Sequence, residues 1–128
     1  MKKVSVIIPV KDSYESFFEV LKSLEPQKDY IEELIIIDSS KSLEIKSLLD
    51  SNANFLTNYI RANNYPGESR NIGVLNASSK IIGFLDSKTI PHKNWLSKGL
   101  EILDNKYKCA FGVTKYKADT NVQKLIRA

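Results

Sequence analysis

Two acidic residues and one arginine stand where they could bind a charged ligand. Asp86 closes the short apolar run Ile81–Asp86, and Asp38 closes a similar run. This pattern is typical of a buried strand that ends in a carboxylate. Arg70 lies in Pro66–Gly73, where proline, glycine and polar residues predict a turn that opens a helix. Carboxylates bind ribose hydroxyls or base N–H groups, and a guanidinium binds phosphates. These residue types suit a ligand that carries a nucleoside and a diphosphate.

Alternating patterns along the chain predict the elements that must position these residues. Strands are predicted at Val4–Val10, Leu34–Asp38, 55–61, Ile81–Asp86 and Cys109–Val113. The first helix is predicted at 13–25, with a capping box at Asp12 and Glu15. A second helix is predicted after a serine cap, with Leu43, Ile45, Leu48 and Leu49 facing inward. A third is predicted from Pro66 to about Ser78, and a fourth around Trp95–Leu103. Strand–helix alternation with short connections predicts an α/β fold. We expect a mostly parallel sheet of about five strands, flanked by helices on both faces.

One edge of such a sheet gathers the carboxyl ends of its strands, and ligands bind there in open α/β folds. The residues expected along this edge are Pro9, Val10, Lys11, Asp38, Arg70, Asp86 and Lys88. Helix N-termini at the same edge would add partial positive charge. A structural interpretation stays open beside this one: both acids would cap helices, Arg70 would form a surface ion pair, and both lysines would face solvent.

Length and charge restrict the class of protein. The chain has 128 residues, a net charge of +4 and a pI of about 9.1. We expect one domain over 1–117 and a tail or short helix over 118–128. The basic residues are scattered, which argues against a nucleic-acid partner. The densest group, Lys106, Lys108, Lys115 and Lys117, is interpreted as a solvated face, with contact to an anionic membrane surface as the alternative.

The cellular location is predicted from what the sequence lacks. The sequence contains neither a signal-peptide apolar region nor an apolar run of about 18 residues. Cys109 is the only cysteine and stands in an apolar context, so it is predicted to be a buried, reduced thiol. We therefore expect a cytoplasmic protein, with the inner face of the membrane as an alternative site. His92, in a polar loop, is predicted to be exposed rather than catalytic.

Several motifs together resemble family 2 glycosyltransferases of the Rossmann-like GT-A fold. The resemblance covers about residues 3 to 113. It rests on Val4–Val10, Ser23–Gln27, Leu34–Asp38, Pro66–Gly73, Ala77, Ile82–Asp86, Pro91 and Trp95-Leu96, in this order and at the family's spacing. Members of this family transfer a sugar from a nucleotide-sugar donor to an acceptor, so the resemblance implies a glycosyltransferase domain.

The resemblance also implies roles for single residues. Pro9 and Val10 would line the base and ribose pocket, and Asp38 would sit beside the base or ribose. Arg70 would contact the nucleotide. Asp86 matches the first acid of the family's Asp-x-Asp motif, which binds the ribose and a divalent metal, Mg²⁺ or Mn²⁺, on the diphosphate.

Two positions depart from the family pattern. Lys88 replaces the second acid of the Asp-x-Asp motif. An ammonium removes one hard oxygen ligand and repels a cation, which argues against a metal at Asp86. We therefore predict that Lys88 meets the diphosphate directly. Ser39 stands where family members often carry another acid, so recognition of the base is expected to be weaker or different.

No residue of the chain matches the family's acceptor site or catalytic base. Asp104 and Asp119 are acids, but they lie in a predicted helix end and in the tail. Two interpretations stay open: the chain is a fragment of a longer enzyme, or it is a nucleotide or nucleotide-sugar binding module without chemistry of its own. The sugar, the base and the acceptor are not identified. An open edge at the fifth strand would allow pairing with a second copy.

Overall fold

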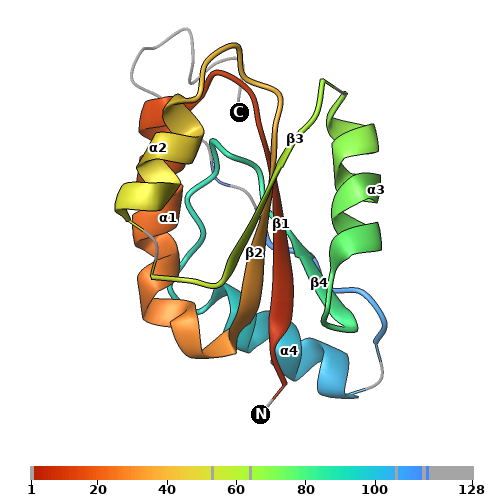
Figure 1. Ribbon diagram of the computed structural model, residues 1–128. Helices are drawn as coiled ribbons and strands as arrows, with labels where there is room; N and C mark the ends of the chain where they lie inside the picture. The colour runs from red at the N-terminus through yellow and green to blue at the C-terminus, as the bar shows by residue number, and fades with distance from the viewer. Residues whose placement is uncertain (1, 53, 64, 106, 114, 116–128) are drawn as a thin grey trace, which may run out of the picture.

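The computed structural model describes residues 2–52, 54–63, 65–105, 107–113 and 115 (Figure 1). In chain order the elements are β1 (Val4–Val10), α1 (Tyr14–Leu24), the 3-10 helix η1 (Glu25–Tyr30), β2 (Ile31–Asp38), α2 (Glu44–Ser51), β3 (Thr57–Arg61), α3 (Pro66–Asn76), β4 (Ile81–Phe84) and α4 (Trp95–Asn105). Strands and helices therefore alternate as the sequence predicts.

The four strands form one sheet in the order β3-β2-β1-β4. Every neighbouring pair is parallel. The register places Val10 of β1 beside Asp38 of β2, and Asp38 beside Arg61 of β3. The carboxyl ends of these three strands therefore lie level with one another. The prediction of a parallel α/β sheet is confirmed.

Helices cover both faces of the sheet. In Figure 1, α3 lies on the opposite side of the sheet from α1 and α2. The larger core lies on the face of α1, α2 and α4 and includes Val6, Ile8, Phe17, Leu24, Leu34, Ile36, Leu48, Leu96 and Leu100. The smaller core joins Ile7, Ile35 and Ile37 to Ile72 of α3. Because the central parts of β1 and β2 are buried on both faces, residues 6–8 and 34–37 are unbroken apolar runs.

Gly73 allows α3 to approach the sheet closely. A Cβ atom placed on Gly73 would lie 2.5 Å from Cγ2 of Ile7, closer than real Cβ atoms come to other atoms. The absence of a side chain at Gly73 therefore lets α3 pack against β1.

A buried carboxylate fastens the opposite, amino-terminal end of the sheet. Oε1 of Glu33 accepts hydrogen bonds from the hydroxyl of Ser5 at 2.8 Å and from the N–H and hydroxyl of Ser78 at 2.6 and 2.7 Å. Burial alone would raise the pKa of Glu33, but these three bonds outweigh burial, and the pKa is lowered. The charged carboxylate ties the turn between α3 and β4 to β1 and β2.

The predicted capping box at Asp12 and Glu15 is wrong. Ser13 occupies the N-cap position of α1 and makes no capping bond with its side chain. Asp12 has a φ of 51°, in the left-handed region. Its Oδ1 accepts the N–H of Lys41 at 3.0 Å, so its carboxylate faces the loop after β2 instead of α1. Leu43 was expected on the inner face of α2, but it precedes the helix and is exposed.

The predicted fifth strand at Cys109–Val113 is also wrong. These residues form no strand, and both Phe111 and Val113 are 90% exposed. An apolar run becomes a strand only when a neighbour supplies hydrogen bonds, and no described strand pairs with this one. Cys109 is exposed, not buried. Pairing of two copies through a fifth strand therefore has no basis in the described sheet.

The boundary at 117 stays a prediction, because Lys106, Lys117 and the tail 118–128 lie outside the described residues. In the described part of the chain, no helix has the length and apolar character that crossing a membrane requires. The cytoplasmic location and the membrane contact stay sequence predictions.

Candidate functional site

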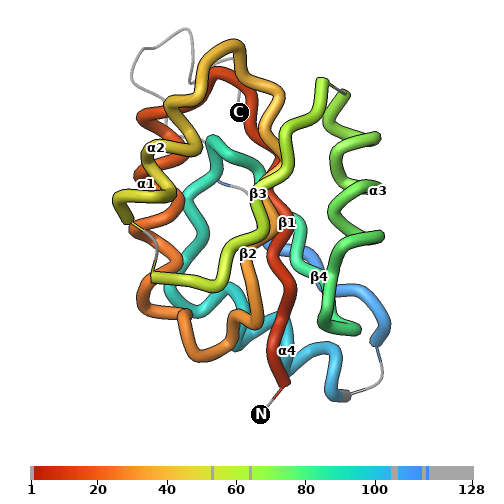
Figure 2. The backbone as a smooth tube through the Cα atoms, viewed as in Figure 1, coloured from red at the N-terminus to blue at the C-terminus, as the bar shows by residue number. Residues whose placement is uncertain are grey.

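A cleft of about 390 Å³ lies at the carboxyl edge of the sheet. It is lined by Pro9, Val10, Lys11, Ser13, Ser39, Pro66, Ser69, Arg70, Asp86, Ser87 and Lys88. Figure 2 shows the chain leaving β1 and β2 and entering α3 at this same end of the sheet. Three segments far apart in sequence therefore meet there: the end of β1, the start of α3 and the segment after β4. Of the seven residues predicted for this edge, six line the cleft, and Asp38 does not.

The start of α3 carries Arg70 to the cleft. Pro66 occupies the first position of the helix, where its fixed φ and missing N–H do not disturb the hydrogen bonds. The N–H of Ser69 donates to the carbonyl of Tyr65 at 3.0 Å and closes the first turn. Ser69 is buried and Arg70 is half-buried. The helix N-terminus adds partial positive charge beside the guanidinium.

A tight turn after β4 carries Asp86 and Lys88. The N–H of Leu85 donates to the carbonyl of Ile7 at 3.0 Å, which continues the pairing of β4 with β1 up to this point. Oδ1 of Asp86 then accepts the N–H of Lys88 at 2.9 Å, and the carbonyl of Asp86 accepts the N–H of Thr89 at 3.2 Å. These bonds fix Lys88 close to Asp86 at the cleft.

The charge of the cleft is mainly positive. Lys11, Arg70 and Lys88 line it, and Asp86 is the one carboxylate among its lining residues. None of the three cations forms an ion pair with another described residue. A cleft with unpaired cations at a helix N-terminus suits a ligand with several negative charges, such as a diphosphate.

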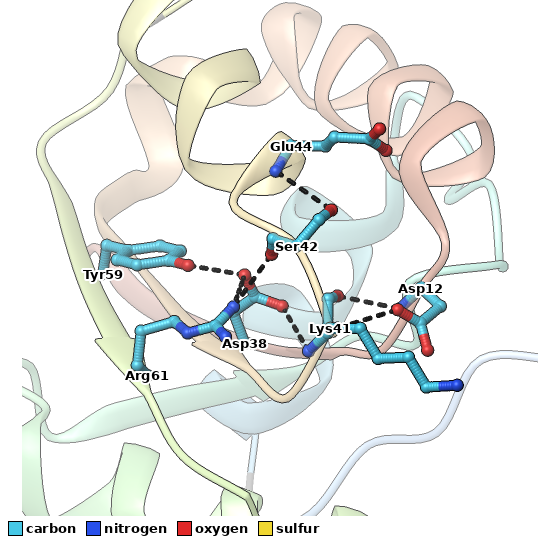
Figure 3. A network of polar contacts seen from close by, with 8 residues as sticks. Asp12, Asp38, Lys41, Ser42, Glu44, Tyr59 and Arg61 are labelled. Carbon is cyan, nitrogen blue, oxygen red and sulfur yellow. Dashed lines mark hydrogen bonds and ion pairs between the residues drawn. The ribbon is translucent and has the colours of Figure 1, made fainter.

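Asp38 does not line the cleft and is fully buried, and Figure 3 shows its carboxylate facing Tyr59 and Arg61. Its Oδ1 accepts the N–H of Ser40 at 2.9 Å. Its Oδ2 accepts the hydroxyl of Tyr59 at 2.5 Å and Nη1 of Arg61 at 3.2 Å. Burial, and then the bond to Asp38, raises the pKa of Tyr59, so the phenol keeps its proton and donates it. The carboxylate of Asp38 is therefore satisfied from within the protein.

The same network holds the loop between β2 and α2. Nη1 of Arg61 also donates to the carbonyl of Ser42 at 3.0 Å. The hydroxyl of Ser40 accepts the N–H of Asp12 at 2.8 Å. Together with the bond from Lys41 to Asp12, these contacts tie the loop to β3 on one side and to the end of β1 on the other. Ser39, which lines the cleft, lies in this fixed loop.

Sequence reasoning missed Tyr59 and Arg61. Both belong to β3, and the pairing of β3 with β2 sets Arg61 directly beside Asp38. The sequence does place these two polar side chains in the predicted strand that follows Asp38. Their contact with Asp38 can be predicted only when β3 is known to lie beside β2.

The family resemblance implies a divalent metal at Asp86, and Lys88 in place of the second acid argues against it. Among the residues that the structure describes, no group of three or more His, Cys, Asp or Glu side chains could hold a metal ion. His92 is exposed in a loop, as predicted, and its Nδ1 accepts the N–H of Asn94 at 3.2 Å.

Comparisons of the sequence with known proteins agree with this architecture. The sequence model described as "Glycosyl transferase family 2" matches residues 5–127. Uncharacterized glycosyltransferases of Rickettsia conorii and Rickettsia felis are each 31% identical over 104 residues, which is 80% of this chain. The matched stretch is only 17% of the length of either relative.

Solved structures share the fold. TarS of S. aureus (residues 1–349) superposes with a TM-score of 0.67 at 23% identity, over 80% of this chain and 32% of TarS. Glucosyl-3-phosphoglycerate synthase from Mycobacterium tuberculosis, in complex with Mn²⁺ and uridine-diphosphate-glucose, superposes with a TM-score of 0.63 at 21% identity, over 82% of this chain and 40% of the synthase. The fold is therefore the Rossmann-like GT-A fold, of which this chain shows a part with four strands.

Proposed function

This chain belongs to glycosyl transferase family 2, and we propose that its cleft binds the nucleoside diphosphate of a nucleotide-sugar donor. The proposal is carried by one observation: Lys11, Arg70 and Lys88 line the same cleft as Asp86. Three cations suit the two phosphates, and a carboxylate suits the hydroxyls of the ribose. Pro9 and Val10, at the end of β1, would lie against the base and ribose.

The chemistry of sugar transfer explains why such a cleft is useful. The bond between the sugar C1 and the phosphate oxygen breaks, and its electron pair leaves with the nucleoside diphosphate. The cations of the cleft would stabilise this growing negative charge. The acceptor hydroxyl attacks C1 and passes its proton to a base within hydrogen-bond reach. We assign no catalytic base, because Asp86 is the one acid of the cleft and its Oδ1 already accepts the N–H of Lys88.

Asp38 would act on the donor indirectly. Its carboxylate is fully buried and holds the loop that carries Ser39. We therefore assign Asp38 a positioning role, in place of the direct contact with base or ribose that the sequence predicts. Ser39 would then be the group of this loop that faces the donor.

The comparisons support the class of ligand. The glucosyl-3-phosphoglycerate synthase that shares the fold was crystallised with uridine-diphosphate-glucose. Uridine diphosphate is therefore the first nucleotide to test. Because the match covers 17% of the curated relatives, the complete transfer reaction is a proposal for the whole protein.

A binding module without chemistry of its own is the second candidate. It is favoured by the single carboxylate among the residues that line the cleft. The two candidates differ in one measurement, the release of UDP from UDP-glucose by the 128-residue chain. A transferase domain releases UDP slowly even when water is the acceptor, whereas a pure binding module binds UDP-glucose and leaves it intact.

Titration calorimetry with UDP, GDP, CDP and ADP tests the proposed site. At least one of these nucleotides should bind, and Arg70→Ala should weaken its binding about 10- to 100-fold, because a charge-assisted contact is lost. Lys80→Ala is the matched control, since Lys80 is an exposed cation just before β4 that does not line the cleft. The proposal fails if none of the four nucleotides binds, or if both variants bind as the unchanged chain does.

A further inference from the structure

The donor atoms of the cleft do not fit a divalent metal. Mg²⁺ and Mn²⁺ are held by several hard oxygen ligands, among which carboxylates supply the negative charge. The lining of this cleft offers one carboxylate, that of Asp86. One oxygen of this carboxylate already accepts the N–H of Lys88 at 2.9 Å. The remaining charged groups of the lining are cations, which would repel a metal ion.

Lys88 lies beside the one carboxylate of the cleft lining. It lies two residues after Asp86, in a turn that is closed by two hydrogen bonds to Asp86. Ser87, between them, is only 6% exposed, so the turn is anchored in the protein. Lys88 itself is exposed, lines the cleft and forms no ion pair with any described acid. Its ammonium is therefore available to an anion in the cleft.

From this arrangement we propose that Lys88 replaces a divalent metal at the donor diphosphate, so that the donor binds without a metal ion. The inference rests on the proposed function and names the group that neutralises the diphosphate charge in the same site. Lys88 would act from the β4 side of the cleft, Arg70 from the start of α3 and Lys11 from the end of β1. Three positive side chains would then neutralise the negative charge of the diphosphate, which a metal ion helps to neutralise in other sites.

A protein with the same fold provides a comparison. The M. tuberculosis glucosyl-3-phosphoglycerate synthase was crystallised with both Mn²⁺ and uridine-diphosphate-glucose. The present cleft has an ammonium beside its one acid, so we expect it to bind a nucleoside diphosphate equally well in the presence and absence of Mn²⁺.

The test measures binding of UDP, GDP, CDP and ADP to the 128-residue chain. Titrations are run once with excess EDTA and once with Mn²⁺. The unchanged chain should give the same dissociation constant in both conditions, and Lys88→Ala should weaken binding about 10- to 100-fold in EDTA. Lys93→Ala is the matched control, because Lys93 is an exposed lysine of the same connection that does not line the cleft. Its affinity should stay unchanged.

A second variant introduces the missing acid. Lys88→Asp places a second carboxylate two residues after Asp86. This variant should bind UDP more weakly than Lys88→Ala in EDTA, because negative charges repel the diphosphate. Added Mn²⁺ should restore part of the affinity, because two carboxylates suit this ion. Circular dichroism melting curves of all variants show whether the fold is kept.

The outcomes separate this inference from the proposed function. If the unchanged chain binds these nucleotides only when Mn²⁺ is added, or if Lys88→Ala or Lys88→Asp binds in EDTA as tightly as the unchanged chain, the metal-free assignment is overturned and the donor site stands. If none of the four nucleotides binds in either condition, both proposals are overturned.

Discussion

Tyr59 donates its hydroxyl hydrogen to Oδ2 of Asp38 over 2.5 Å and joins the middle of β3 to the end of β2. Asp38 is fully buried and also accepts bonds from Ser40 and Arg61. A buried carboxylate is stable only when its oxygens are paired. The carboxylate of Asp38 is therefore one of the groups that hold the loop after β2 in place.

Asp38→Asn should destabilise the fold. The amide keeps the size of the carboxylate, but its NH₂ group cannot accept a hydrogen bond, so either Ser40 or the pair Tyr59 and Arg61 loses its acceptor. We expect the free energy of unfolding to fall by about 1–3 kcal/mol, measured by urea denaturation. Tyr59→Phe removes one donor and keeps the ring, so its cost should be smaller, about 1 kcal/mol. Equal stability of Asp38→Asn and the unchanged chain would show that the network does not hold the loop.

Asp12 provides a second test of the same loop. Its φ of 51° is easier for glycine than for alanine, and its carboxylate accepts the N–H of Lys41. Asp12→Ala loses the bond and keeps the strain, whereas Asp12→Gly loses the bond and relieves the strain. Asp12→Ala should therefore be less stable than Asp12→Gly by about 1 kcal/mol in urea denaturation. The reverse order would contradict the left-handed conformation at this position.

Two glycines in helices of equal length should respond to alanine in opposite ways. At Gly73 of α3, a Cβ would lie 2.5 Å from the Ile7 side chain, whereas at Gly99 of α4 no atom lies within 4 Å. Gly73→Ala should lower the free energy of unfolding by about 1–3 kcal/mol through overpacking. Gly99→Ala should raise it by about 0.5–1 kcal/mol through helix propensity. Thermal melting distinguishes the two, and a similar shift in both variants would contradict the close contact of α3 with β1.

Glu33 should make stability depend on pH. Its pKa lies below 4.5 in the folded chain, so the unfolded chain binds the proton first as the pH falls. The stability that the charge contributes is complete at neutral pH and is lost as the pH falls through the folded pKa. Glu33→Gln keeps the acceptor oxygen and removes the charge, at a cost of about 1 kcal/mol at pH 7. In urea denaturation from pH 7 down to pH 3, the difference between the two proteins should shrink below about pH 4.5. A difference that stays constant over this range would contradict the prediction.

Much of the fold and of the cleft could be predicted from local patterns. Apolar runs closed by Asp38 and Asp86 predict strands with acids at their carboxyl ends, and the alternation with helices predicts a parallel sheet. A parallel sheet brings these ends together by its geometry, which is why Pro9, Val10, Lys11, Arg70, Asp86 and Lys88 were found to line one cleft.

Tertiary structure alone decided what the polar side chains touch. Asp38 turns toward Tyr59 and Arg61 because the register of β3 with β2 brings them together. Asp12 turns toward Lys41, 29 positions away, instead of toward its own helix. The segment Cys109–Val113 has the composition of a strand, yet no described strand pairs with it. Composition and spacing are local properties and determine the type of element. The partner of a hydrogen bond depends on which distant groups the folded chain places within 3 Å of it.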